Sequence, residues 1–326
     1  MKKYGIAFAG FRHGHIFGLY DAASKNENVN VVSAWEENEE AKNAACENGV
    51  VFNCKSLDEM LSDEKVDIVA IGDYYGRRGS LAIKALEAGK HVIADKPLCT
   101  SLDELCEIRR LAKEKNLKIG MMLDMRYNKN VLAAKKLVDS GEIGEINNIY
   151  FGGQHPLLYG TRPGWYFEDG KHGGTINDIS IHGIDIVKNL LGLDVKEICA
   201  ARTWNKLAKE APCFKESGQF MLTLSNGAGL IADVSYTAPD KVGYSLPYYW
   251  DFKIWGTEGM ISFAIYSEKV ELYKKTQDGV ILCDGIESTR NNLDDLIDDI
   301  NGKNNCTDGI LSCTEEVLKI QRFADR

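Results

Sequence analysis

The stretch His-Val-Ile-Ala-Asp-Lys-Pro at residues 91–97 decides the fold class of this 326-residue chain. Residues 92–94 form an apolar run of the kind found in buried β-strands, and the run ends abruptly at Asp95, Lys96 and Pro97. In open parallel sheets, ligands bind beyond the carboxyl ends of the strands. Because Pro97 restricts the backbone at this strand end, Lys96 is expected to point into a cofactor cleft.

Short apolar runs alternate with helical patterns over the first 120 residues. Gly89 predicts the end of one helix, and Ser101, followed by Leu-Asp-Glu, predicts the start of another. Alternation with short loops is typical of a doubly wound parallel sheet. The expected strands are 4–9, 29–35, 66–71, 91–94 and 118–122, and the expected helices include 37–48, 80–88 and 101–115.

The pattern changes after about residue 123, where β-type runs follow one another without helices between them. Such runs predict a largely antiparallel sheet. We therefore expect an α/β nucleotide-binding domain at residues 1–122 and an α+β domain with a large, mainly antiparallel sheet at residues 123–326. The expected strands of the second domain are 146–151, 196–204, 218–224, 229–236, 251–255, 260–266 and 269–273, and its expected helices are 128–140, 175–191, 291–300 and 309–323.

Composition narrows the class of protein. Apolar residues make up 44% and charged residues 27% of the chain, which is ordinary for a globular protein. The net charge of −9 argues against nucleic acid or an anionic membrane as a partner. No apolar run approaches the roughly 20 residues of a membrane span, and Arg12 and His13 break the short N-terminal run too early for a signal peptide. Nine cysteines without a CxxC pair favour free thiols in the cytoplasm. We predict no metal site.

The loop after the first strand is a weak dinucleotide signal. It contains Gly10 and Gly14, whose spacing does not complete a G-x-G-x-x-G fingerprint. An ordinary strand–turn–helix explains the same residues equally well. The position nevertheless suits a pyrophosphate at a helix N-terminus, and Arg12 could supply a positive charge to it.

The second expected strand ends at Glu36, about twenty residues after this loop. An acid in that position accepts hydrogen bonds from the adenosine ribose hydroxyls. Glu37, Glu39 and Glu40 follow, and their charge would repel a 2′-phosphate, so NAD is favoured over NADP. The alternative is that these acids only complement the dipole of the helix that starts there.

A second chemical signal lies on the expected helix 175–191. Asp178, His182, Asp185 and Asn189 fall on one stripe. Apolar residues on both flanks indicate a buried helix, so the polar stripe needs partners or a water-lined cleft. A histidine can exchange a proton near neutral pH, and Asp178 could orient His182. The alternative is a buried His–Asp pair that only holds the helix in place.

Lys96 favours the catalytic interpretation of this stripe. A lysine in a cleft can polarise a hydroxyl or carbonyl oxygen. Hydride transfer from a C–H group to nicotinamide requires removal of the hydroxyl proton, which Lys96, Asp178 and His182 could together accomplish. The alternative for Lys96 alone is a solvated surface residue.

The chain resembles the Gfo/Idh/MocA family, which includes glucose–fructose oxidoreductase and inositol 2-dehydrogenase. Residues 88–97 resemble the family's A-G-K-H-V-x-x-E-K-P segment, and residues 173–185 resemble its G-G-x-x-x-D-x-x-x-H-x-x-D helix. Residues 124–127 and 140–144 resemble its N-x-R-[FY] segment and S-G-x-I-G turn. The resemblance implies a Rossmann domain, an open-faced sheet domain that often mediates oligomers, and oxidation of a sugar or polyol hydroxyl with Lys96, Asp178 and His182 in the active site.

The chain departs from the family pattern in three segments near the expected cofactor. The glycine fingerprint is degenerate, Asp95 replaces a glutamate, and Asp-Tyr-Tyr-Gly-Arg-Arg at residues 73–78 stands where members usually have T-P-N-x-x-H. Arg78 takes the place of that histidine, although the tyrosines and arginines of this segment could also be surface residues. The expected cofactor contacts are Gly10, Phe11, Arg12, His13, Glu36, Asp73, Tyr74, Arg78, Asp95 and Lys96.

Substrate contacts are expected from the loop that precedes the helix of Asp178 and His182. An aromatic ring and a guanidinium suit a sugar ring or an acidic sugar, although packing within the loop explains the same residues. The candidates beside Asp178 and His182 are His155, Arg162, Trp165, Tyr166 and His172. Trp250 and Trp255 are expected on the sheet surface or in an interface.

Three functions fit this pattern. The first is an NAD-dependent dehydrogenase acting on a sugar, inositol or related polyol. The second is a redox-neutral, NAD-using enzyme that cleaves glycosides, and the third is a non-catalytic NAD- or sugar-binding protein. The sequence leaves open whether Lys96 or His182 accepts the proton. The expected partners are a small-molecule substrate and a second copy of the chain, in a homodimer or homotetramer formed through the C-terminal sheet.

Overall fold

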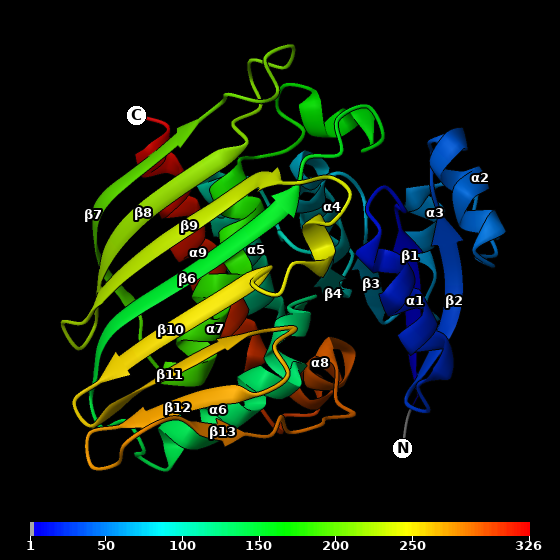
Figure 1. The fold of residues 1–326 in the computed structure, drawn as a ribbon. Coiled ribbons are helices and arrows are strands. Elements are labelled where there is room, and N and C mark those ends of the chain that lie inside the picture. The colour runs from blue at the N-terminus through cyan, green and yellow to red at the C-terminus, as the bar shows by residue number, and fades with distance from the viewer. Residues whose placement is uncertain (1–2) are drawn as a thin grey trace. The chain divides into compact units, whose positions relative to one another are not determined.

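The computed structural model describes residues 3–326, which form two compact units (Figure 1). Unit 1 consists of the chain up to Met122 together with Gly170–Gly173 and Asn291–Glu315, and unit 2 consists of Leu123–Asp169, Gly174–Arg290 and Glu316–Arg326. Across residues 3–326, none of the helices has both the length and the apolar character that crossing a membrane requires.

Unit 1 is built on a five-stranded sheet in the order β2-β1-β3-β4-β5, and every neighbouring pair is parallel. This confirms the predicted doubly wound α/β fold. The strands are β1 Tyr4–Ala9, β2 Val29–Trp35, β3 Ile68–Ile71, β4 His91–Ala94 and β5 Ile119–Met121, and the helices between them are α1 His15–Lys25, α2 Glu39–Glu47, α3 Leu57–Ser62, α4 Tyr75–Glu87 and α5 Leu102–Lys115.

Helix α4 begins at Tyr75 rather than near residue 80, where the sequence pattern placed it. Its first turn carries Arg78, whose side chain is fully buried. Because arginine is a polar residue, Arg78 does not extend the apolar pattern of this helix. The helix was therefore predicted to begin about one turn later than it does. The start of α5 matches expectation, because the Ser101 side chain accepts a hydrogen bond from the backbone N–H of Glu104.

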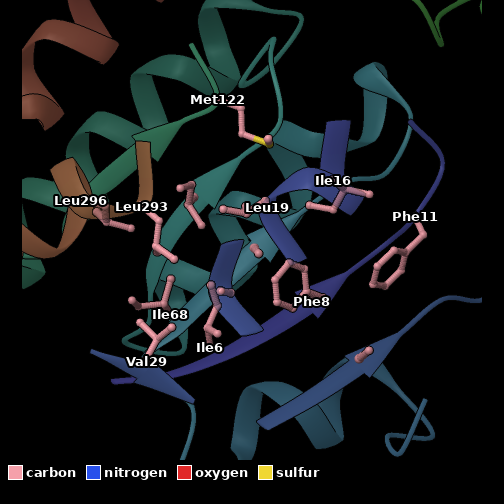
Figure 2. Close-up of a cluster of buried hydrophobic side chains, with 14 of the residues drawn as sticks. Ile6, Phe8, Phe11, Ile16, Leu19, Val29, Ile68, Met122, Leu293 and Leu296 are labelled. Atoms are coloured by element: carbon pink, nitrogen blue, oxygen red, sulfur yellow. The ribbon is translucent and has the colours of Figure 1, made fainter. Parts of the chain in front are cut away.

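Two distant segments complete the core of unit 1 (Figure 2). Helix α8 (Asn292–Ile300) places Leu293 and Leu296 in one cluster with Ile6 and Ile68 of the sheet. The first part of α9 (Cys306–Ala324) is tied to β5, because the Thr307 hydroxyl accepts a hydrogen bond from the Ile119 amide at 2.9 Å. Residues 291–315 therefore belong with the N-terminal segment, whereas the sequence analysis placed them in the second domain.

Unit 2 contains an eight-stranded sheet in the order β13-β12-β11-β10-β6-β9-β8-β7. All its neighbouring strands are antiparallel except β6 and β9, which confirms the mainly antiparallel prediction. The strands are β6 Ile146–Pro156, β7 Val195–Trp204, β8 Ser217–Leu224, β9 Gly229–Ala238, β10 Trp250–Gly256, β11 Gly259–Ala264, β12 Val270–Lys274 and β13 Ile281–Cys283. The other elements are the helices α6 Lys129–Asp139 and α7 Ile181–Leu191, the π-helix η3 Ile176–Ser180, and the short 3₁₀ turns η1 Asp124–Tyr127, η2 Gly164–Phe167 and η4 Gly243–Ser245.

The two faces of this sheet differ. Helices α6 and α7 pack against one face through β6, β11 and β12 (Figure 1). Burial alternates along β8 and β9, as expected for strands with one covered face. Met221 and Ile231, which pair across these two strands, are 46% and 57% exposed. Apolar side chains are therefore exposed on the sheet.

Candidate active site and cofactor site

The segment that carries Asp178 and His182 is not one continuous α-helix. Residues Ile176–Ser180 form a π-helix, and α7 begins only at Ile181. A π-helical turn contains more residues than an α-helical turn. Asp178 and His182, four residues apart, therefore do not lie on one α-helical stripe as expected. Turns of this kind are frequent at functional sites.

Gln321 of α9 fixes the start of this segment. Its side-chain oxygen accepts hydrogen bonds from the backbone amides of Ile176 at 3.0 Å and Asn177 at 3.2 Å. Gly174 has φ +97°, and a Cβ there would lie 2.3 Å from the Gln321 side chain. The glycine is therefore needed both for its backbone conformation and for space. Gln321 was not among the predicted site residues, because nothing local in the sequence connects it to a segment about 145 residues earlier.

Asp178 lies almost completely buried, at 2% exposure, where it accepts a hydrogen bond from the Tyr236 hydroxyl of β9. His182 is 8% exposed, and its ring lies 5.8 Å from that of Trp250. The His155 ring lies 5.9 Å from Tyr236 and 6.1 Å from Trp250. Asp178 and His182 therefore border the same aromatic cluster.

Trp250 was expected on the sheet surface or in an interface, and this is wrong. It is 1% exposed. Burial alternates along β10, so that Trp250, Phe252 and Ile254 are buried, whereas Trp255 is half-buried. The period-two pattern was visible in the sequence, but which of the two faces would be covered was not.

The loop candidates lie around the same cluster. The Tyr249 hydroxyl lies 3.0 Å from Nε2 of His155. Trp165 and Tyr166 are stacked with ring centroids 4.1 Å apart, and both are buried. Tyr236, Tyr244 and Tyr249, which the sequence analysis did not single out, surround His155. Tyrosines on separate strands and turns meet only when the sheet forms, so no local signal marks them.

Arg162 is directed at its own loop. Its guanidinium donates to the carbonyl oxygens of Leu157 at 2.9 Å and Pro156 at 2.7 Å. It also lies over the rings of Tyr166 and Tyr236, at 4.6 and 5.0 Å. These contacts fix the loop against the aromatic cluster, and they leave little of the guanidinium for an acidic sugar.

Asp185 has a structural partner. Its carboxylate receives hydrogen bonds from Nε of Arg126 at 2.8 and 3.0 Å and from Nη2 at 2.5 Å. Both side chains are largely buried. This bidentate pair joins α7 to η1. It gives Asp185, the third residue of the predicted stripe, a structural role.

The glycine loop of unit 1 has one position that only glycine can fill. Gly10 has φ +88°, and a Cβ there would lie 2.8 Å from the backbone nitrogen of Asp73. The next residue, Phe11, turns its ring into an aromatic group with Phe8 and Phe17. Phe11 can therefore contribute only its backbone to a cofactor, and its amide donates to Glu36 at 2.7 Å.

Glu36 lies directly after β2 and connects that strand end to the glycine loop. One carboxylate oxygen accepts from Phe11, and the other accepts from the amide of Asn38 at 2.8 Å. Burial raises the pKa of Glu36, although these backbone hydrogen bonds act in the opposite direction. Arg12 lies 4.0 Å from the same carboxylate.

The segment after β3 is a second group of candidates. Asp73 is 1% exposed, and burial raises its pKa while its hydrogen bond from the Tyr74 amide lowers it. The Tyr74 ring has Arg12 at 5.7 Å and Lys171 at 5.3 Å. Arg77 pairs with Glu37 beyond β2. These side chains contact one another and Asp73 and Arg78 are buried, so the segment is not simply a run of surface residues.

Asp95 is the centre of a charged cluster. Its carboxylate receives hydrogen bonds from Nδ1 of His13 at 2.5 Å, Nδ1 of His15 at 3.2 Å and Nη2 of Arg78 at 3.2 Å. Burial by itself would raise the pKa of Asp95, but the charged groups around it, Arg78 among them, hold that pKa well below its usual range. Burial lowers the pKa of His13 to about 4, against the opposing effect of Asp95.

Nitrogen and oxygen atoms of His13, His15 and Asp95 lie within 4.8 Å of one another, as in some metal sites. Arg78 argues against a metal here. Its guanidinium is fully buried and bonded to the same carboxylate, and a divalent cation beside it would be repelled in a poorly screened interior. The group is better described as a hydrogen-bonded ionic cluster.

Lys96 and His172 lie near this cluster, both in unit 1. Lys96 is 3% exposed, so the surface alternative for it is wrong. Its Nζ lies 5.8 Å from the centre of the Tyr75 ring, and His172 lies 5.4 Å from the same ring. Asp178 and His182 belong to unit 2.

Comparison with known proteins identifies the family. Residues 5–122 match the oxidoreductase family with an NAD-binding Rossmann fold, and residues 131–262 match the C-terminal domain of the same family. The chain belongs to the Gfo/Idh/MocA family of oxidoreductases. The resemblance inferred from the motifs is confirmed, and the glycine loop of unit 1 lies in the matched NAD-binding fold.

Individual relatives are distant. The chain is 30% identical over 207 residues to scyllo-inositol 2-dehydrogenase (NAD(+)) of Bacillus subtilis, covering 62% of this chain and 56% of that protein. It is 26% identical over 193 residues to D-xylose dehydrogenase of Paenarthrobacter nicotinovorans, covering 55% and 50%. A solved structure of an oxidoreductase from Erwinia carotovora atroseptica is 25% identical, with a TM-score of 0.85 and 99% of both chains covered. The chain spans between 37% and 59% of the length of the curated relatives it matches.

Proposed function

We propose that this protein is an NAD-dependent dehydrogenase that oxidises a CH–OH group of a sugar, inositol or related polyol. The observation that carries the proposal is the burial of Lys96, Asp178 and His182, at 3%, 2% and 8% exposure, in a chain of this family. Polar side chains are costly to bury, so these three are held by specific contacts, such as the hydrogen bond from the Tyr236 hydroxyl to Asp178. Relatives named for inositol and xylose support the substrate class.

The residues around the glycine loop fit a dinucleotide. Gly10 allows close approach of the backbone, and α1 begins at His15, so its N-terminus suits a pyrophosphate. Glu36 lies at the end of β2, where an acid binds the ribose hydroxyls. NAD, when bound, supplies the hydride acceptor. Glu36 at the end of β2 favours NAD over NADP, because its carboxylate would repel a 2′-phosphate; the Glu37 carboxylate is paired with Arg77.

The protein residues handle the proton. Oxidation removes a hydride from the carbinol carbon and a proton from its hydroxyl, and the proton passes to either Lys96 or His182. Asp178, held by the Tyr236 hydroxyl, would orient His182 within unit 2 and stabilise a positive charge that forms on its imidazole.

The aromatic cluster favours a neutral substrate ring. His155 is surrounded by Tyr236, Tyr244, Tyr249 and Trp250. Ligand pockets are lined mainly by apolar and aromatic side chains, with a few polar groups that fix the orientation of the ligand. Tyr244, which is 44% exposed, is the member of this cluster that we propose to contact the ring, because Trp250 and Tyr236 are each buried at 1% exposure. We therefore propose a neutral sugar or polyol in preference to an acidic one, because Arg162 is already bonded to its own loop.

The test is NADH formation, followed by absorbance at 340 nm, with NAD and then NADP against inositols, aldoses, uronic acids and sugar phosphates. Wild type should reduce NAD with a neutral sugar or polyol. Lys96→Ala should lower kcat by about 10²-fold or more, as expected for loss of a proton-handling group. Lys113→Ala, at an exposed position of α5, is the matched control and should keep wild-type activity.

Tyr236→Phe tests the role of Asp178. A hydrogen bond to a charged group contributes about 1.5–3 kcal/mol, so its loss in the transition state should lower kcat about 10- to 100-fold. NAD binding by calorimetry without net NADH would instead support the redox-neutral glycoside-cleaving or the binding role. Failure to bind either nucleotide would refute the cofactor assignment.

We further propose that the exposed sheet face joins two or four copies of the chain in the cytoplasm. The apolar side chains of Met221, Ile231 and Leu282 on this sheet support an interface. Sedimentation equilibrium should give a dimer or tetramer for wild type and a smaller species for Ile231→Lys. A monomeric wild type at micromolar concentration would contradict this proposal.

A further inference from the structure

The departures from the family motifs are connected to one another in space. Asp95 replaces the usual glutamate, Arg78 stands in place of a histidine, and His13 lies in the degenerate glycine loop. The side chains of His13 and Arg78 both bond to the Asp95 carboxylate. Tyr75 belongs to the same altered segment as Arg78. Its hydroxyl oxygen lies 3.1 Å from Nε2 of His13. These changes therefore form one local arrangement around the residue that precedes Lys96.

Arg78 is bonded to the backbone carbonyls of Lys96 and Pro97 and to the side chain of Asp95, the residue before Lys96. Its Nε donates to the carbonyl oxygen of Asp73 at 2.7 Å, and its Nη1 donates to the carbonyl oxygens of Lys96 and of Pro97, the latter at 3.4 Å. Its Nη2 donates to Asp95. Because Asp73 follows β3 and Lys96 follows β4, one buried side chain joins the carboxyl ends of two adjacent strands.

Tyr75 contacts the other end of Lys96. The guanidinium of Arg78 lies 4.6 Å from the centre of the Tyr75 ring, and Nζ of Lys96 lies 5.8 Å from the same centre. The ring is itself fully buried and is held by the hydrogen bond to His13. Lys96 is thus bonded at its carbonyl oxygen by Arg78 and contacted at its ammonium group by an aromatic face.

We propose that Arg78 is the positioning residue for Lys96, and that Tyr75 holds the lysine ammonium in the geometry that Arg78 sets. The role rests on the proposed function of Lys96, but the contacts that define it lie wholly in unit 1. No histidine could replace Arg78 here, because an imidazole has at most two N–H donors. A lysine would keep the charge and lose the planar fork that reaches Asp73, Asp95 and the Lys96–Pro97 carbonyls.

The first experiment needs neither substrate nor cofactor. Wild type, Arg78→Lys and the control Arg110→Lys, at an exposed position of α5, are treated with an amine-reactive reagent, and modification of Lys96 is followed by peptide mass spectrometry across pH. We expect Lys96 to react at least fivefold faster in Arg78→Lys, with a shifted pH profile, while exposed lysines such as Lys113 are unchanged. Equal Lys96 reactivity and pH profile in a folded Arg78→Lys protein would overturn the proposal.

Tyr75 supplies a second variant in case Arg78→Lys does not fold. Tyr75→Leu removes the ring face and should also expose Lys96 to the reagent at least fivefold. Tyr75→Phe keeps the ring and should leave Lys96 at least half as well protected as in wild type. Unchanged reactivity in Tyr75→Leu would overturn the role of the ring.

The second experiment uses turnover. We expect Arg78→Lys to lower kcat at least tenfold. Arg78 was expected to contact the cofactor, but its guanidinium is bonded to protein atoms, so KM for NAD should stay within about twofold. If Lys96 reactivity changes but wild type oxidises no alcohol, the positioning role stands and the proposed function fails. If wild type turns over and Arg78→Lys keeps both kcat and Lys96 protection, the positioning role is wrong.

Discussion

His13 makes the stability of this protein depend on pH in a way that can be measured. Its imidazole is 12% exposed, donates from Nδ1 to Asp95, and lies 3.1 Å from the Tyr75 hydroxyl through Nε2. Burial lowers its pKa from 6.5 to about 4. The folded protein therefore keeps His13 neutral at a pH where the unfolded chain takes up a proton.

The direction and size of the effect follow from this difference. Stability from His13 is fully present above pH 6.5 and is lost as the pH falls toward 4, because the unfolded state binds the proton first. At about 1.36 kcal/mol for each unit of pKa shift, the free energy of unfolding should fall by about 2.4 kcal/mol between pH 7 and pH 4.5 through His13 alone. For a folded unit of this size that corresponds to about 5–10 °C in Tm. Asp95 adds little in this window, since its pKa in the unfolded chain is about 3.9 and pH 4.5 lies above it.

The assay compares thermal melts of wild type and His13→Asn from pH 7 to pH 4.5. Asparagine retains a donor for Asp95 and cannot titrate, so the variant should lose about 5–10 °C less than wild type over this range. Tyr75→Phe is the control, because it removes the hydroxyl beside Nε2 and leaves the imidazole in place, so most of the pH dependence should persist. Parallel curves for wild type and His13→Asn would refute the reasoning.

Two further predictions concern unit 2 and α9. Gly183→Ala should lower the free energy of unfolding by about 1–3 kcal/mol, because its Cβ would lie 2.3 Å from the Phe151 ring. The matched change Gly309→Ala, in a helix with nothing within 4 Å of the new Cβ, should instead stabilise by up to about 1 kcal/mol. Asp185→Asn should cost about 3–5 kcal/mol in denaturant unfolding, because it leaves the guanidinium of Arg126 buried without its charge partner; a loss below 1 kcal/mol would contradict a structural role for the pair.

Local patterns were sufficient for the architecture. Strand–helix alternation predicted the parallel sheet, and consecutive β-type runs predicted the antiparallel one, because burial on one or two faces leaves a period in the sequence itself. The break after β4 at Asp95, Lys96 and Pro97 was equally local. It predicted the end of the strand, which the structure confirms at Ala94, whereas the cofactor cleft expected beside Lys96 stays a prediction.

Boundaries failed where a buried polar residue interrupted the pattern. The fully buried Arg78 hid the first turn of α4. The apolar stripe of α8 was visible in the sequence, but its destination was not, because Leu293 meets Ile6 only after the chain has returned to unit 1. The alternation of residues along β10 was visible in the sequence. Only the packing of unit 2 decided that the face with Trp250 is the covered one.

The sequence by itself determined the fold class and the family, since both are encoded in spacing over a few residues, and it supplied the hypothesis that Lys96, Asp178 and His182 carry the chemistry. Tertiary structure alone decided what those residues contact. Tyr236 reaches Asp178 across 58 positions, and Arg78 reaches the Lys96 backbone across 18. Such partners depend on where strands and helices end in space. A hydrogen bond between distant segments produces no periodic pattern in the sequence, so it cannot be predicted from local periodicity.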